Sequence, residues 1–382
     1  MVIKKISNFV KNNKFISALI LISFFSSLRN LFLPLVGDEG TYAKIAENII
    51  YNGSYWFNGR PSTVTPSLPL IMALFYTKTA PAIGFILSKL VNLLLIIIGL
   101  KYLYFFLRNL RLGNELMWCI LLLTVVNNNF VFWSLLLYPE SILFCFFWMF
   151  IYFLSKEIRE PQDFLNILIP FIILLLTRYV FAVFSVFLLI VGWKYLQTLV
   201  REKKYKDLQK VLSFSLIAII PVIFWFKFVY YAEQNFNIGL SYFGKFKNQD
   251  IFHHLKTGIG LDGRNGIPAF ISLFIPATSI RSWIISSLLL ITFVAGFITK
   301  LKVEQYRKLF FAILLVQLGL IFAGTGFSRY WLPLLPGYLL GFYLFYKSLK
   351  LKDSYFILLA KIVAIIYVAN EMRLNIQIMT NL

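Results

Sequence analysis

The stretch LVGDEGTYA, at residues 35–43, follows directly after the first long apolar run of the chain. Two adjacent carboxylates, Asp38 and Glu39, stand where a run of roughly twenty residues, enough to cross a bilayer, has just ended. In the segment that follows, apolar residues recur at the i, i+3, i+4, i+7 spacing of one helix face. These apolar residues are Tyr42, Ile45, Ala46, Ile49 and Ile50. We expect this amphipathic helix to lie flat at the membrane surface and to hold both carboxylates at the boundary between water and lipid.

Asp38 can serve structure or chemistry at this position. As a helix N-cap, its side chain would accept hydrogen bonds from the backbone N–H groups of Gly40 or Thr41, and Asn52-Gly53 would end the helix. As a general base, it would take a proton from a hydroxyl group of an acceptor. One residue can do both, so the sequence leaves both interpretations open.

The composition is that of a membrane protein. Hydrophobic residues make up 59% of the chain and charged residues only 14%, which a soluble domain of this length does not show. The net charge of +21 does not indicate a nucleic-acid partner, because the basic residues cluster in short segments between apolar runs, as the positive-inside rule describes. Cys119 and Cys145 lie inside apolar runs and are expected to be buried without a disulfide.

The order of apolar runs predicts an all-α polytopic protein with about eleven transmembrane helices in one domain over residues 1–382. Lys14 to Val36 is expected to form one uncleaved first helix that leaves the cytoplasm. Residues 37–68 then form a first outer loop that carries the amphipathic helix, and residues 232–267 form a long outer loop. Three asparagines at 127–129 are costly in hydrocarbon and are expected at the outer end of a helix or in a cavity wall.

On this topology, acidic and basic side chains gather on the outer face, as in a site that binds an anion and moves a proton. Arginines hold phosphate groups by bidentate, charge-assisted hydrogen bonds. The alternative for each lone arginine is a contact with lipid headgroups, and for Glu140 it is compensation of the charge at a helix N-terminus. His253-His254 is a poor metal chelate because the two residues are adjacent. The candidate site residues are Asp38, Glu39, Tyr42, Arg60, Glu140, Arg178, Arg329 and Tyr330.

Several of these residues lie in stretches that resemble a known family. The segment from Gly37 to Ala43 resembles the signature of the GT-C membrane glycosyltransferases, in the branch of the protein mannosyltransferases and aminoarabinose transferases. Four further stretches resemble later elements of that family in the same order. They are Thr65-Pro66-Ser67-Leu68-Pro69-Leu70, Tyr138-Pro139-Glu140-Ser141, Leu176-Thr177-Arg178-Tyr179 and the run from Ser328 to Pro336.

The resemblance implies an inverting glycosyltransferase that takes a sugar from a polyprenyl-phosphate carrier outside the cytoplasmic membrane. Asp38 would be the general base, with Glu39 orienting it or the acceptor. Arg178 and Arg329 would bind the donor phosphate, with Arg60 as a weaker candidate. The acceptor could be a lipid, a glycan or a protein. No cofactor is predicted with certainty; a divalent metal could take part but is not indicated by the residues. The chain departs from the family in its short length and in Ser67, where a second proline is common.

Two other functions fit the same residues. A transporter or flippase of a lipid-linked sugar would also place polar groups in a membrane protein. Transporters usually show paired repeats, broken helices and ionisable groups near the middle of the membrane. Here no repeat is evident and the carboxylates lie at one interface, which favours the enzyme. A non-catalytic assembly subunit that keeps the fold is the third alternative.

Overall fold

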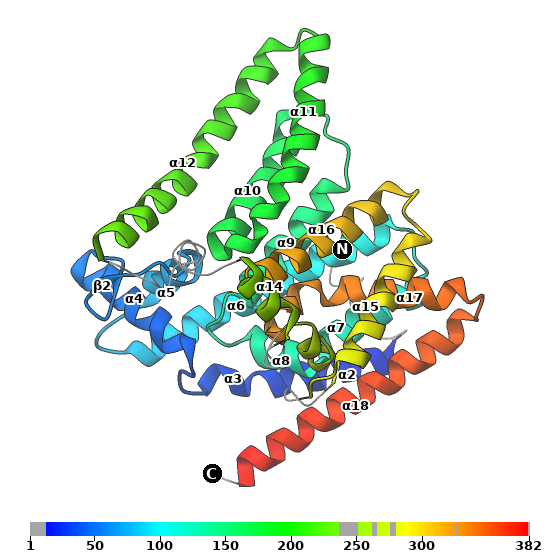
Figure 1. The fold of residues 1–382 in the computed structure, drawn as a ribbon. Coiled ribbons are helices and arrows are strands. Elements are labelled where there is room, and N and C mark those ends of the chain that lie inside the picture. The colour runs from blue at the N-terminus through cyan, green and yellow to red at the C-terminus, as the bar shows by residue number, and fades with distance from the viewer. Residues whose placement is uncertain (1–12, 237–250, 262–265, 276–279, 325–326, 381–382) are drawn as a thin grey trace.

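The computed structural model describes residues 13–236, 251–261, 266–275, 280–324 and 327–380. The described chain is almost entirely helical, and its single hairpin pairs two short antiparallel strands, with Trp56 opposite Pro61. Much of the predicted outer loop at 232–267, including residues 237–250, lies outside the described residues. Its described parts include helical residues at 232–236 and 251–259 (Figure 1).

Along the chain, the elements are α2 (Lys14–Ser27), α3 (Arg29–Phe32), α4 (Asp38–Asn52), β1 (Trp56–Phe57), β2 (Arg60–Pro61), α5 (Ser67–Phe75), α6 (Pro81–Asn109), α7 (Asn114–Val126), α8 (Asn128–Ser134), α9 (Glu140–Leu154), α10 (Pro161–Thr177), η1 (Tyr179–Phe184), α11 (Ser185–Arg201), α12 (Tyr205–Phe236), α14 (Ile251–Ile259), η2 (Ile267–Leu273), α15 (Trp283–Ile298), α16 (Glu304–Phe322), η3 (Ser328–Leu334), α17 (Leu335–Ser348) and α18 (Asp353–Thr380).

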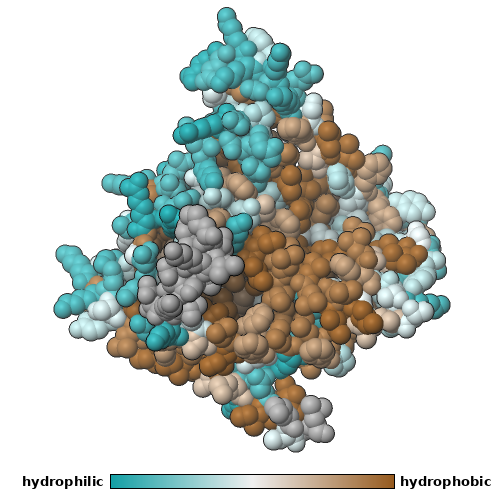
Figure 2. Space-filling model, turned by 180° about the vertical axis from the view of Figure 1, so that it is seen from behind, coloured by the Kyte–Doolittle hydropathy of each residue, from teal (hydrophilic) through white to brown (hydrophobic). Residues whose placement is uncertain are grey.

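The described residues contain six helical segments long and apolar enough to cross a membrane, or seven if the bent pair α7 and α8 is one span. Helices α9, α10 and α15 are apolar but shorter. The chain is therefore a polytopic all-α membrane protein, and the expected count of about eleven spans is not confirmed. Many apolar side chains point outward, as on α12, where Leu216, Ile217 and Phe224 are exposed. Figure 2 shows a broad hydrophobic area on one face, with hydrophilic residues gathered toward the tips.

The first helix ends earlier than the sequence predicts. Residues Lys14 to Val36 were expected in one helix, but α2 ends at Ser27 and the short α3 ends at Phe32. Leu33 is already extended, with ψ of 142°. The cause is Pro34, because the residue before a proline is driven out of the helical region.

Three asparagines form a packed bend between α7 and α8, where the two helix axes turn by 59°. The side-chain amides of Asn127 and Asn129 donate to backbone carbonyls in η2, at 2.9 and 2.7 Å. The amide of Asn128 donates to the carbonyl of Tyr367 at 3.0 Å. All three side chains are buried. The bend is thus bonded to η2 and α18 within the packed interior.

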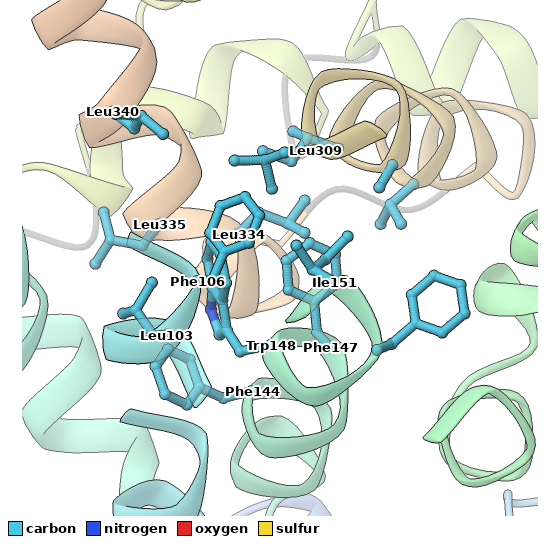
Figure 3. Packing of buried hydrophobic residues seen from close by; sticks show 14 of the residues in the cluster. Leu103, Phe106, Phe144, Phe147, Trp148, Ile151, Leu309, Leu334, Leu335 and Leu340 are labelled. Atoms are coloured by element: carbon cyan, nitrogen blue, oxygen red, sulfur yellow. The ribbon is translucent and has the colours of Figure 1, made fainter. Parts of the chain in front are cut away.

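The central helix of the core is α9, and few of its residues reach the surface. Phe144, Phe147, Trp148 and Ile151 meet apolar residues of α6, α16, η3 and α17 (Figure 3). The indole N–H of Trp148 donates to the carbonyl of Pro333 at 3.0 Å. This bond holds η3 against α9, which matters because both elements carry candidate site residues.

The amphipathic helix of the first loop is confirmed as α4. It ends at Asn52 as predicted, and Gly53 follows in the left-handed region with φ of 58°, its N–H bonded to the carbonyl of Asn48. Ile45 and Ala46 are fully buried, and Ala46 packs in a cluster with residues of α5, whereas Ile50 is 48% exposed. The predicted apolar stripe therefore faces protein along part of its width.

The asparagine bend gives the first testable expectation. Asn129→Ala removes a buried donor and leaves the carbonyl of Ser272 without it, so we expect a loss of about 1–3 kcal/mol in the free energy of unfolding. Asn235→Ala is the matched control, because Asn235 is exposed and its amide donates to the carbonyl of Tyr231, one turn before it. Unfolding by sodium dodecyl sulfate in mixed micelles measures both, and equal effects of the two changes would contradict the role of the bend.

Candidate active site

The start of α4 fixes the direction of Asp38. Gly37 is the N-cap residue, with φ of +59°, and a Cβ atom there would come 2.8 Å from the hydroxyl of Tyr138. Asp38 is the first residue of the helix, and no side chain caps this helix end. The N-cap interpretation of Asp38 is therefore wrong. Its side chain is 57% exposed, so its carboxylate is open to a ligand.

Glu39 has a different environment from its neighbour. It is fully buried, and its two carboxylate oxygens accept backbone N–H bonds from Val36 at 2.7 Å and from Leu137 at 2.5 Å. The hydroxyl of Tyr138 donates to the carbonyl of Val36 at 2.8 Å. Glu39 thus anchors the start of α4 to the segment before α9, and its oxygens are already used in holding Asp38 in place.

Four charged side chains from distant parts of the sequence meet at this point. A guanidinium nitrogen of Arg329 lies 2.8 Å from a carboxylate oxygen of Asp38, and its Nε lies 3.8 Å from Oε1 of Glu140. The same Glu140 oxygen accepts a hydrogen bond from Arg178 at 2.8 Å. The two acids and two arginines balance in charge. We call Asp38, Arg329, Glu140 and Arg178 the charged cluster.

Each member of the charged cluster is placed by a helix end. Glu140 is the first residue of α9, where the helix dipole favours a negative charge, so the compensation expected from the sequence coexists with the two arginine contacts. Arg178 follows the last residue of α10 in an extended conformation that redirects the chain into η1. Arg329 is the second residue of η3. Glu140 is 1% exposed, and its Oε2 has no hydrogen-bond partner among the described residues.

Aromatic rings cover the faces of both guanidinium groups. The central carbon of Arg178 lies 3.7 Å from the ring centre of Tyr330, and that of Arg329 lies 4.6 Å from the ring centre of Tyr138. Trp133 is a further neighbour of Arg329, at 5.3 Å. Such contacts favour a cation over a ring face. Sequence analysis missed Tyr138 and Trp133 as site residues, although Tyr138 stands directly before the Pro139-Glu140 motif.

The cluster shifts the ionisation of the groups around it. Burial acts to raise the pKa of the Tyr330 hydroxyl, but the positive charges of Arg178 and Arg329 outweigh it, so this pKa lies below its ordinary value. Burial acts to lower the pKa of Arg329, but the negative charge of Glu140, together with the interactions with Tyr330 and Asp38, outweighs burial and raises this pKa. Tyr42, whose ring meets that of Tyr138 edge-on, has a pKa raised mainly by burial. Arg329 is thus a stable cation, and Tyr330 is a more acidic phenol than Tyr42.

The rest of the first loop is tied to the Arg178 segment. The hydroxyl of Thr65 donates to the carbonyl of Thr177 at 2.7 Å, and the hydroxyl of Tyr179 donates to the carbonyl of Thr63 at 3.3 Å. Arg60, by contrast, lies exposed on β2, and none of the ion pairs found among the described residues joins it to the charged cluster. The predicted phosphate arginines are therefore divided: two lie in the cluster and one lies apart from it.

Across the described ranges, no group of three His, Cys, Asp or Glu residues could hold a metal ion. Of the adjacent histidines, His254 is buried on α14, where its ring lies against Gly324.

Solved structures share this architecture. ArnT from Cupriavidus metallidurans bound to undecaprenyl phosphate superposes with a TM-score of 0.55 at 13% identity, over 90% of this chain and 61% of that chain. The same protein in the apo state gives 0.54 at 12% identity, over 91% and 62%. The chain has the ArnT fold. This confirms the fold expected from the resemblance to the GT-C aminoarabinose transferases.

The chain matches less than two thirds of the length of ArnT. No protein-family model matches the sequence, and no curated protein matches it. At this identity the likeness to ArnT establishes a shared fold.

The geometry of Glu140 gives a stability test that needs no substrate. Glu140→Gln leaves two largely buried arginines facing a neutral side chain, so we expect a loss of roughly 3 kcal/mol in the free energy of unfolding. Glu157→Gln is the matched control, because Glu157 pairs with Arg159 at 2.8 Å on the exposed surface, where a salt bridge contributes about 0–1 kcal/mol. Detergent unfolding of both variants gives the comparison. A Glu140→Gln protein as stable as the control would show that the arginines do not depend on Glu140.

Proposed function

We propose that the protein is an inverting membrane glycosyltransferase that moves a sugar from a polyprenyl-phosphate carrier to an acceptor outside the cytoplasm. The observation that carries the proposal is the charged cluster, in which the exposed carboxylate of Asp38 pairs with Arg329, and Glu140 joins Arg329 to Arg178. A second support is the fold, because the ArnT structure that shares it was solved with undecaprenyl phosphate bound. A carboxylate beside paired arginines is suited to removing one proton and holding one phosphate.

The reaction is a single displacement at the anomeric carbon of the donor sugar. Asp38 takes the proton of an acceptor hydroxyl, and the acceptor oxygen attacks the anomeric carbon from the side opposite the phosphate. The bond from that carbon to the phosphate oxygen breaks, and its electron pair leaves with the polyprenyl phosphate. Arg178 and Arg329 stabilise the negative charge that develops on this leaving group. Glu39 takes no proton in this scheme and only orients Asp38.

Phosphate binding requires a partner exchange, because the cluster is neutral when empty. Glu140 is buried and held at the start of α9, so it stays. Asp38 is 57% exposed, so its contact with Arg329 is the one that a phosphate oxygen can replace. The arriving donor would thus release Asp38 from the arginine at the moment when a free carboxylate is needed as base.

We place the site on the outer face of a cell membrane, and charge asymmetry supports this. The end of α11 and the turn that follows it hold Arg201, Lys203 and Lys204, so the positive-inside rule puts this turn in the cytoplasm. Eleven crossings follow from the six long segments if the bent pair α7 and α8, the helices α9, α10 and α15, and the unit formed by η3 and α17 also span. That unit would be roughly 35 Å long, from about 2.0 Å per residue in η3 and 1.5 Å in α17, which is enough to cross.

The first functional expectation separates enzyme from transporter. Asp38→Asn keeps the size of the side chain and removes the base, so transfer of labelled sugar from a polyprenyl-phosphate donor should fall roughly 10²–10⁴-fold, while donor binding persists. Asp353→Asn is the matched control, since Asp353 also begins a helix and also pairs with a cation at 2.8 Å. A folded Asp38→Asn protein that transfers sugar at the wild-type rate would exclude Asp38 as base. Movement of labelled donor across the bilayer without transfer would favour the flippase.

The second functional expectation concerns the phosphate. Arg329→Ala and Arg178→Ala should each weaken donor binding by about 2–5 kcal/mol, as for the loss of one partner of a buried charge pair. Lys should rescue poorly, because it lacks the planar fork. Arg60→Ala, on an exposed strand, should bind the donor as the wild type does. Equilibrium binding of radiolabelled polyprenyl phosphate measures the affinity of all three alanine variants. Unchanged affinity in Arg329→Ala and Arg178→Ala would show that these two arginines do not bind the donor phosphate.

A further inference from the structure

Lys89 is a cation in the interior of a membrane-spanning helix. It lies in α6, and its side chain is 1% exposed. A buried ammonium group is costly in such a place unless it finds partners. Its Nζ donates to the backbone carbonyls of Asn30 at 2.8 Å and Leu33 at 2.9 Å. The ammonium group is thus hydrogen-bonded to two backbone oxygens of another segment.

Those two oxygens belong to the place where the first span ends. The last carbonyls of a helix have no partner within the helix, and Pro34 prevents α3 from continuing. The ammonium of Lys89 supplies the missing donors. It therefore fixes the point at which the chain leaves the first span on its way to Asp38.

A second anchor follows three residues later. The N–H of Val36 is bonded to Glu39 and its carbonyl to Tyr138. The segment from Leu33 to Val36 is consequently held at both ends. Lys89 of α6 bonds to Leu33, and Glu39 of α4 and Tyr138, just before α9, bond to Val36. Lys89 and Glu39 also attract each other electrostatically. Asp38 begins α4 two residues beyond the second anchor, so its carboxylate position depends on both.

We propose that Lys89 is a positioning residue for Asp38: it sets where the first loop starts and thereby aligns the carboxylate with Arg329, without touching the substrate. This inference rests on the proposed role of Asp38 as base. It separates two tasks within the site. Arg178 and Arg329 are held by Glu140, α9 and η3, so donor binding does not depend on Lys89, whereas the alignment of the base does.

The kinetic test uses two lysines of one helix. Lys89→Met removes the anchor with little change in side-chain length. Lys101→Met is the matched control, because Lys101 lies about three turns further along α6 and is exposed. We expect kcat for sugar transfer to fall roughly 10–100-fold in Lys89→Met, the cost of a displacement of about 1 Å. Donor affinity should remain within about threefold of the wild type, since a threefold change is only ~0.7 kcal/mol.

A second variant, Lys89→Gln, keeps an amide donor on a shorter side chain. It should also lower kcat without lowering donor affinity, but to a smaller degree, and it remains informative if Lys89→Met does not fold.

A second readout needs no substrate. Spin labels are attached at Lys44→Cys on α4 and at Arg108→Cys at the end of α6, which are both exposed positions. Pulsed electron paramagnetic resonance then measures the distance between the two helices. Cys119 and Cys145 are buried and are replaced by alanine. We expect a single narrow distance distribution in the parent and in Lys101→Met, and a broadened or displaced one in Lys89→Met and Lys89→Gln.

Two results would overturn the proposal. One is a folded Lys89→Met protein whose turnover and distance distribution match those of Lys101→Met. The other is a parallel loss of donor affinity and turnover, which would mean that Lys89 supports the fold as a whole. Absence of transfer in the wild type would contradict the proposed function instead, and the distance distributions alone would then decide whether Lys89 holds the start of the first loop.

Discussion

The contact of Glu140 with two arginines is the constraint on which the site depends. A buried carboxylate and two nearly buried guanidinium groups are each costly to remove from water, and the cost is tolerable only when they neutralise one another. Arg178 and Arg329 therefore have to converge on the first residue of α9, although 150 residues separate them in the chain. The bond from Trp148 to Pro333 holds η3 in the register that this convergence requires.

The same logic governs the places where helices break. A backbone carbonyl in a water-free interior needs a donor, and a chain whose apolar side chains outnumber all others has few donors to offer. Asn127 and Asn129 bond to η2, and Lys89 bonds to the end of α3. These polar residues in apolar helices specify how the helices fit together, because the apolar residues around them can pack in many ways.

The extent to which sequence predicted this structure follows from the same chemistry. Run length and spacing gave the helical class, the extent of α4 and the order of the elements. They did not give the break after Ser27 or the number of spans, because an apolar side chain looks the same in sequence whether it meets lipid or protein. Five site candidates do meet: Asp38, Glu140, Arg178, Arg329 and Tyr330. Glu39 differs because neighbouring residues on a helix point about 100° apart, so one faces the site and the other the core.

The aromatic rings explain why the two arginines have such defined directions. When rings cover the flat faces of a guanidinium group, only its edges remain for hydrogen bonds. Tyr330 covers Arg178, and Tyr138 lies over Arg329, so the N–H groups of both are confined to the plane that contains Glu140. One edge of Arg329 then reaches Asp38, the most exposed of the four charged side chains. Arg329 can accept a different anion along that edge without moving, because the ring over its face and the contact with Glu140 stay in place.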